Sequence, residues 1–362
     1  MKGVVAIGVI VVAGVVVGRV PAQSPPRGDD PAVAAAKARA VAYDTVEATF
    51  EVRETVAVGA ISSSSPLAPK GITTPERETV LESVFRIVLV GRKLRLENNH
   101  PVWAPAQGKA LAVRLVNVAD GELHRSLYPV GMSDPNVPDG YIHRSPDSRD
   151  IRSYILLPLT AYLRGADPKL TAYALGGFRP TGTPVKVGDR MCQEYSGAES
   201  KAEANRMWLD PEAGFVLRRF RTERGGRPAV QHDVTYRPDG SGGVVPEGWR
   251  HVRFAPDGQP QVTTDVRVTR LDRSPALPAD VFELTFPPGA RVYDTREDKT
   301  YTVQPDGRMR EFSLATGEYR DETVYQPGTS WARQYWWVLV LGGGSIVALV
   351  VIARRQYRRP RL

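Results

Sequence analysis

The sequence predicts an α+β protein that is mainly β: a curved antiparallel sheet with a few covering helices, followed by a C-terminal transmembrane helix. Apolar and polar residues alternate along many short segments, among them residues 45–56, which is typical of strands with one buried face. From residue 185 such segments follow one another, separated by Pro-Asp-Gly turns at 238–240 and 256–258. Strands that return at short intervals with turns between them favour one large antiparallel sheet.

Two stretches have helical character. Residues 31–43 are rich in alanine, with Asp30 in position to cap the helix and proline at the first helical residue. Residues 151–164 place apolar side chains, including Ile155, Leu159 and Tyr162, on one face, so this helix is expected to cover something apolar. Pro158 predicts a kink there, or a split into two short helices.

Residues 205–220 predict a hairpin that is apolar on both faces. The alternation of strand side chains sets Met207, Leu209, Phe215 and Leu217 on one side and Trp208 and Val216 on the other. Both faces must therefore be covered, by a packed core or by a bound apolar ligand. The pattern does not decide which set faces the cover.

The N-terminal end predicts a secretory signal peptide over residues 1–22, cleaved between Ala22 and Gln23, and then a linker over 23–30. The alternative is an uncleaved N-terminal anchor. Residues 335–353 predict a transmembrane helix, because the 18 apolar residues from Trp336 to Ala353 would extend about 27 Å as a helix. Trp336 and Trp337 lie at one end of this segment.

Arg354 and Arg355 begin a basic tail over residues 354–362, and positive residues stay on the cytoplasmic side. We therefore expect a single-pass protein of the bacterial inner (cytoplasmic) membrane, with its N-terminal domain in the periplasm and its C-terminus in the cytoplasm. The formal net charge of +8 comes mostly from the two ends, and residues 23–334 carry about +1. This near-neutral domain has no electrostatic reason to bind nucleic acid.

Catalytic and metal-binding motifs are not found in the sequence. No two of the five histidines have metal-ligand spacing, and no nucleophile elbow or phosphate-binding loop occurs. We expect no enzyme activity, no metal and no cofactor. His232 and His251 lie on successive predicted strands and are interpreted as a surface pair. Cys192 is the single cysteine, so no internal disulfide forms, and the residue is interpreted as a small buried side chain.

Four stretches carry a resemblance to a known family: "AVAYDTVEATFEVRET", "RMWLDPEAGFVLRRF", "GGVVPEGWRHVRFAPDGQ" and "LPADVFELTFPPGARVYD". They resemble the opening helix and first strand, the central hairpin, the next strand and the closing strand of the LolA-like and RseB-like half-barrel family of outer-membrane lipoprotein carriers. The resemblance covers residues 31–293, with a membrane-proximal stalk expected over 294–334. A membrane-anchored variant of this kind is expected in planctomycete-type bacteria.

The resemblance implies an open half-barrel whose apolar concave face is partly plugged by helices and holds lipid or lipoprotein acyl chains. The candidate cavity residues are Met207, Leu209, Phe215, Leu217, Ile155, Leu159 and Tyr162. The chain departs from a soluble carrier by its length, stalk and anchor, which puts free shuttling of cargo in doubt. The main alternative is an RseB-like interaction or signalling module with a self-filled core and a membrane-protein partner, and a minor alternative is an unmarked hydrolase.

Overall fold

The computed structural model describes residues 30–60, 76–104, 109–128, 136–144, 155–168, 171, 173–197, 203–240, 242–313 and 318–325. Two compact units divide between Thr285 and Phe286. The predicted signal peptide, transmembrane helix and basic tail lie outside the described residues and stay predictions. Among the described residues, no helix has both the length and the apolar character needed to cross a bilayer.

The first unit contains the two expected helices and a short 3-10 turn. Helix α1 is Pro31–Ala42, and the Asp30 carboxylate caps it by accepting the backbone N–H of Ala32 at 2.8 Å. Helix α2 is Leu157–Arg164, and η2 is Leu175–Gly177. The kink predicted at Pro158 does not occur in α2, and residues 151–154, which the alternative of two short helices includes, lie outside the described residues. This proline lies in the first turn of α2, where its missing N–H has no helical partner to lose, so it begins the helix.

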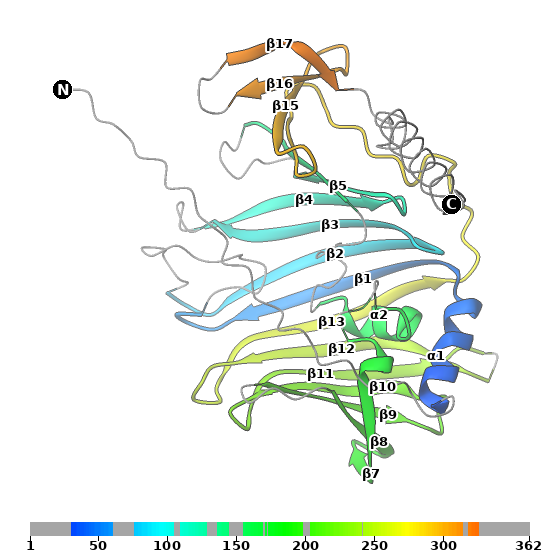
Figure 1. The fold of residues 1–362 in the computed structure, drawn as a ribbon. Coiled ribbons are helices and arrows are strands. Elements are labelled where there is room, and N and C mark those ends of the chain that lie inside the picture. The colour runs from blue at the N-terminus through cyan, green and yellow to red at the C-terminus, as the bar shows by residue number, and fades with distance from the viewer. Residues whose placement is uncertain are drawn as a thin grey trace, which may run out of the picture. The chain divides into compact units, whose positions relative to one another are not determined.

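Thirteen described strands of the first unit form one antiparallel sheet, as the sequence predicts (Figure 1). Their spatial order is β7-β8-β9-β10-β11-β12-β13-β1-β2-β3-β4-β5-β6. The strands are β1 Thr45–Val56, β2 Thr79–Val90, β3 Lys93–Ala104, β4 Lys109–Ala119, β5 Leu123–Tyr128, β6 Asp139–Arg144, β7 Phe178–Val187, β8 Arg190–Gly197, β9 Glu203–Asp210, β10 Val216–Arg224, β11 Arg227–Pro238, β12 Val244–Phe254 and β13 Pro260–Asp272.

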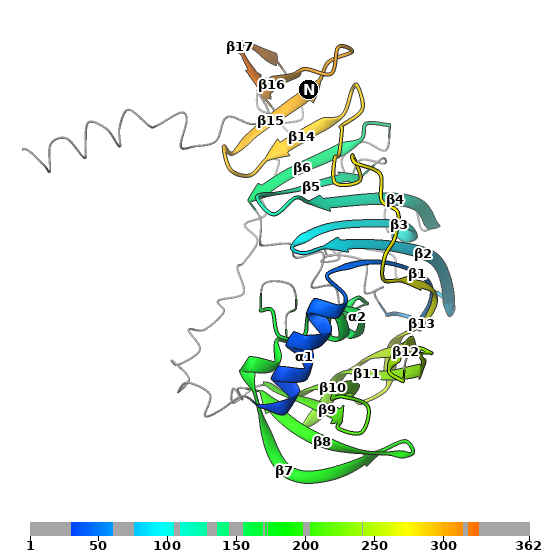
Figure 2. The ribbon, with the colours of Figure 1, turned by 90° about the vertical axis from the view of Figure 1, so that its right-hand side faces the viewer.

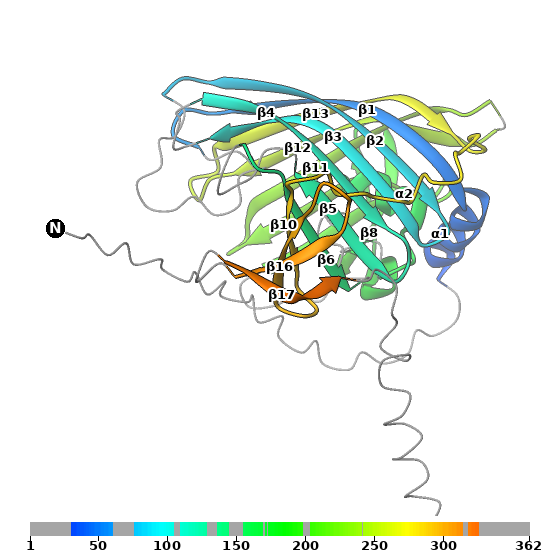
Figure 3. The ribbon, with the colours of Figure 1, turned by 90° about the horizontal axis from the view of Figure 1, so that it is seen from above.

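Strand β1 joins the two halves of this sheet (Figure 3). Strands β2–β6 and β7–β13 each pair with their neighbours in sequence, whereas β1 pairs with β2 on one side and with β13 on the other. Val52 of β1 lies opposite both Ser83 and Val266. One N-terminal strand therefore aligns two meanders that lie far apart in the chain.

Helices α1 and α2 lie on one side of the sheet, which we call the inner face (Figure 2). Alternate residues of β1, including Phe50 and Val52, pack on this face into one buried cluster with residues of both helices. The Phe50 ring stacks on Phe85 at a centroid distance of 5.3 Å and lies 5.7 Å from Trp249. The other side, the outer face, carries ion pairs such as that between Arg86 and Glu47 at 2.7 Å.

The second unit is a small antiparallel meander. Its described strands are β14 Arg291–Asp294, β15 Lys299–Val303, β16 Met309–Ser313 and β17 Glu318–Tyr325. The Tyr301 hydroxyl donates a 2.6 Å hydrogen bond to Glu297, and Lys299 pairs with Glu311 at 2.8 Å. Strands β15 and β16 pair with each other, with one further described strand on each side.

Replacement of Phe50 by alanine tests whether the inner face holds the sheet together. Phe50→Ala should lower the free energy of unfolding by about 3–5 kcal/mol, because it opens a cavity between two rings in the core. Urea unfolding followed by circular dichroism measures the change. The control is Val84→Ala on the outer face, where the side chain is 50% exposed and the cost should stay below about 1 kcal/mol. Equal losses would contradict a core on the helix side.

Candidate functional site

The structure brings most of the predicted cavity residues together on the inner face. Met207, Leu209 and Leu217 from the β9–β10 hairpin are buried in the same cluster as residues from the α2 region. The α2 members are Ile155, Leu159 and Tyr162. Phe215 is partly buried and packs against this cluster. The residues named from sequence therefore form one shared apolar surface between α2 and the sheet.

The hairpin faces follow the expected alternation with one exception. Trp208 points away from the cluster: its indole N–H donates to Glu194 at 3.2 Å, and the Arg221 guanidinium lies 5.6 Å from its ring. Val216 was expected on the side of Trp208 but is buried in the inner cluster. Val216 and Leu217 are thus neighbours in sequence that both belong to the cluster, and a bulge between Leu217 and Arg219 shifts the alternation of the residues that follow.

The hairpin turn is built around Asp210. The Phe215 N–H donates to the Asp210 carbonyl at 2.7 Å, and both Gly214 and Phe215 have left-handed backbone angles, with φ of 72° and 58°. Phe215 therefore closes the loop instead of opening the return strand, which corrects the predicted strand start. The buried Asp210 carboxylate accepts from Arg218 at 2.9 and 3.0 Å, which compensates its charge.

Polar contacts hold the helices to the sheet at one end of the inner face. The Tyr162 hydroxyl donates to the Val244 carbonyl at 2.7 Å and lies 2.9 Å from the Tyr43 hydroxyl. Burial raises the pKa of Tyr162 well above its usual value. Arg164 donates to the carbonyls of Tyr43 and Asp44 at 2.8 and 2.9 Å. Helix α2 is thus fixed to the junction between α1 and β1 and to the start of β12.

The histidine pair is buried, so its interpretation as a surface pair is wrong. His232 and His251 lie directly opposite each other on β11 and β12, are 0% and 1% exposed, and stack at a centroid distance of 4.6 Å. Burial and the neighbouring His251 lower the pKa of His232 well below its usual value. Burial, with Arg253 adding to it, lowers the pKa of His251 to about 4. Both imidazoles are therefore neutral at physiological pH.

A second set of polar residues lies on the helix-facing side of β4–β6. Asn117 is fully buried and pairs in register with Ser126, which in turn lies opposite Tyr141. In the adjacent row, His124 stacks on His143 at 5.8 Å. The inner face is therefore apolar at its centre and polar on this flank. Sequence reasoning missed the difference because these strands alternate without a long apolar run.

Reactive groups are few in the part of the chain that the structure describes. Cys192 is fully buried, and burial raises its pKa to about 11, so its thiol stays protonated and unreactive. Within the same part of the chain, no three histidine, cysteine or acidic side chains are placed to bind one metal ion.

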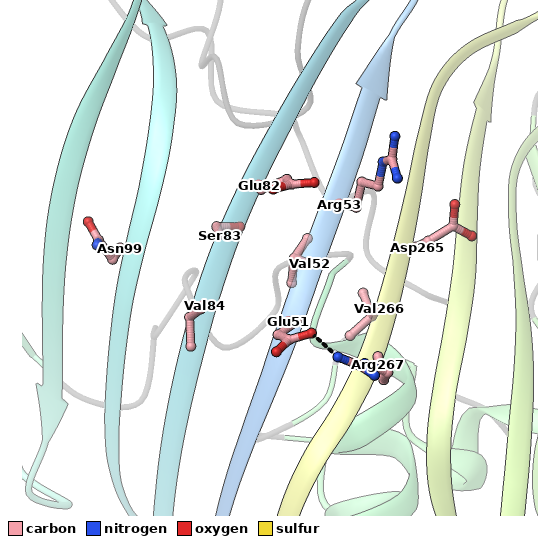
Figure 4. A pocket seen from close by; sticks show the side chains of 10 residues that line it. All are labelled: Glu51, Val52, Arg53, Glu82, Ser83, Val84, Asn99, Asp265, Val266 and Arg267. Atoms are coloured by element: carbon pink, nitrogen blue, oxygen red, sulfur yellow. Dashed lines mark hydrogen bonds and ion pairs between the residues drawn. The ribbon is translucent and has the colours of Figure 1, made fainter.

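The outer face has a shallow depression of about 550 Å³ across β13, β1, β2 and β3 (Figure 4). Its polar rim includes Glu51, which pairs with Arg267 at 2.5 Å. Val84 adds an exposed apolar side chain. Because oppositely charged side chains line it together, the depression has no single charge preference.

The chain matches no family model and no curated protein. Among solved structures, it is similar to a DUF1329 family protein from Desulfovibrio piger, at 11% identity and a TM-score of 0.42, over 70% of this chain and 98% of that one. It is also similar to a chain named as an outer membrane lipoprotein-sorting protein domain from Vibrio parahaemolyticus, at 11% identity and a TM-score of 0.40, over 69% of this chain and 95% of that one. A third similar structure is a LolA superfamily protein from Nitrosomonas europaea, at 12% identity and a TM-score of 0.35, over 69% of this chain and 97% of that one.

The buried histidines predict a loss of stability in mild acid. In the unfolded chain a histidine has a pKa near 6.5, whereas in the folded chain the pKa of His251 is about 4. The stability contribution is therefore complete above about pH 6.5 and is lost as the pH falls towards 4, at up to ~1.4 kcal/mol per pH unit for each histidine. Urea unfolding at pH 7.5, 6 and 5 measures this slope. His251→Gln should flatten it, and an unchanged slope in that variant would refute the assignment.

The tyrosine pair can be tested by a double-mutant cycle. Tyr162→Phe removes the hydroxyl that contacts both Tyr43 and the Val244 carbonyl and should cost about 1–2 kcal/mol. Tyr43→Phe should cost less, and the coupling between the two should be roughly 0.5–1 kcal/mol in urea unfolding. Strict additivity of the two changes would show that the hydroxyls do not stabilise each other.

Proposed function

We propose that this is a non-enzymatic protein of the cell envelope that binds an acyl chain of a lipid or lipoprotein on the inner face of its first unit. The observation that carries the proposal is the mismatch between that face and its helices. Strands of up to 13 residues extend about 40 Å, whereas the 12 residues of α1 and the 8 of α2 extend about 18 and 12 Å. The apolar lining extends onto β2 and β3 through Phe85, Ile87, Leu94 and Leu96, which are 0–4% exposed and belong to the same buried cluster as the helix residues.

This lining suits a linear hydrocarbon. The Phe50 ring contacts the rings of Phe85 on β2 and Trp249 on β12, and the aliphatic residues beside them carry no charge. A hydrocarbon chain gains about 0.8 kcal/mol for each CH₂ group that it buries. The affinity of this apolar centre would grow with the length of the hydrocarbon chain.

The chain ends support a tethered form of this function. We propose a single span over residues 335–353, with Trp336 and Trp337 at the periplasmic side and Arg354 and Arg355 at the cytoplasmic side of a bacterial inner membrane. The support is the sequence pattern. A chain ending at Arg333 should move from the membrane fraction to the periplasmic fraction, and its retention in the membrane would count against the anchor.

A second candidate is an interaction or signalling module with a self-filled core. It is favoured by one observation: the residues expected to line a cavity pack against α2 in a shared cluster. In that case the inner face holds no ligand, and a membrane protein beside the span would be the partner. The two candidates differ in whether lipid reaches the inner face.

Photo-crosslinking tests acyl-chain binding on the full chain in its own membrane. Cells are fed a C16 fatty acid that carries a diazirine and an alkyne, irradiated, and the labelled peptides are mapped by mass spectrometry. We expect adducts on β1–β3 and β9–β13. Phe85→Trp, which fills the inner face, should reduce them about fivefold or more, since overpacking excludes a chain.

The matched control for this experiment is Val84→Trp, one residue away on the same strand but on the outer face, and it should label like the unmodified chain. Labelling confined to residues 335–353 would exclude acyl binding by the sheet. It would favour the self-filled interaction module.

A further inference from the structure

A band of polar residues crosses the inner face beside its apolar centre. His232, His251, Thr264 and Glu54 lie opposite one another in register on four adjacent strands, β11, β12, β13 and β1. Neighbouring positions of the same face add Trp249, Arg253 and Ser83. We call these seven residues the polar band. Adjacent strands lie about 4.8 Å apart, so the band from β11 to β2 is about 19 Å wide.

Several members of the band have no hydrogen-bond partner. Both ring nitrogens of His232, the hydroxyls of Thr264 and Ser83, and the indole N–H of Trp249 are buried and unpaired. The four side chains are between 0% and 6% exposed. Because more than about 90% of buried polar groups in native proteins are paired, four unpaired groups on one face indicate that something else completes them.

The hydrogen-bonding groups of the polar band determine what kind of molecule can pair with them. The Trp249 indole can only donate, so the partner must present an acceptor, while the hydroxyls and neutral imidazoles can donate or accept. The charged members offset each other, since the Glu54 carboxylate acts on Arg253 and raises its pKa against the lowering by burial. A site without net charge gives no advantage to a carboxylate or a phosphate over a neutral group.

Apolar rings flank the band along its own register. Phe220 lies opposite His232, with their centroids 5.9 Å apart, and Phe50 lies beside Trp249. A molecule that reaches the band therefore also contacts the hydrocarbon-binding centre of the face. It must be amphipathic over a short distance, with a neutral acceptor next to a chain.

We propose that the polar band is a subsite for the neutral ester or amide carbonyls that join an acyl chain to its carrier molecule. Ser83, Thr264 and Trp249 donate to these carbonyl oxygens, and the stacked His232 and His251 provide a neutral wall beside them. This inference rests on the proposed function and adds to it a chemical class: the band discriminates acyl esters and amides from free hydrocarbons and from free fatty acids.

The test uses three photoreactive C16 probes with the same diazirine and alkyne: a methyl ester, an alkane and a carboxylic acid. Each is added to membranes that contain the full chain, and labelling of inner-face peptides is quantified. The ratio of ester to alkane labelling is compared between variants, so differences in membrane partitioning cancel. Each lost hydrogen bond should reduce this ratio on the order of fivefold.

The variants are chosen to preserve the fold. Thr264→Val and Ser83→Ala replace unpaired hydroxyls by apolar atoms of nearly the same size, so the double variant should unfold at the same temperature or higher. It should lose the preference for the ester while alkane labelling stays. Thr263→Val, the preceding residue on the outer face of β13, is the matched control and should keep the preference. Trp249→Phe gives an independent loss of the indole donor.

The outcomes separate this inference from the proposed function. Inner-face labelling by none of the probes refutes acyl binding itself. If all three probes label the inner face and the ratio of ester to alkane labelling is the same in the unmodified chain and in the double variant, acyl binding stands but the carbonyl subsite is refuted. Preference for the carboxylic acid overturns the assignment to a neutral group.

Discussion

The inner face depends on the register of β1 between β2 and β13. Because side chains alternate, a shift of one residue in either ladder would turn Phe50 and Val52 outward and bring Glu51 and Arg53 against the helices. Charged residues beneath α2 would then lack partners, so the register is strongly specified. The bulge between Thr49 and Phe50 on the β13 side is the one irregularity in these two ladders. The register of β1 therefore sets which residues form the core, the polar band and the ion pairs of the outer face.

The same face combines two demands that usually conflict. An apolar centre stabilises the sheet by excluding water, whereas buried hydroxyls and imidazoles without partners weaken it. Natural cores avoid such groups unless they serve a purpose beyond stability. Here four side chains with unpaired polar atoms, those of Ser83, His232, Trp249 and Thr264, lie on β2, β11, β12 and β13, and the Asn117 amide on β4 is unpaired as well.

Much of the architecture could be predicted from the sequence because local signals agree with the fold. Asp30 before proline and alanine marks the start of α1, and the Pro-Asp-Gly turns separate β11, β12 and β13. The sequence predictions were wrong where one local rule allows two structures. Pro158 breaks a helix interior but also suits a first turn, and only the true helix start decides. Phe215 was assigned to a strand because its apolar character outweighed the turn geometry that Gly214 sets.

The candidate site was harder to predict than the fold. Met207, Leu209 and Leu217 could be placed on a common face by alternation, but the choice of the buried face needed the partner strands. The burial of His232 and His251 had no local signal at all. Each is a polar residue on an alternating strand, and its environment comes from residues tens of positions away.

The pairing of β1 with β13 also determines when this protein can finish folding. Glu51 and Arg267 are partners in the ladder, so about 216 residues separate the two sides of a single contact. Long-range strand pairing of this kind is slow, because a large loop must close before the contact stabilises anything. The first strand to be synthesised has to wait for nearly the last strand of its sheet. Until then the apolar residues of β1 stay exposed to chaperones and to aggregation.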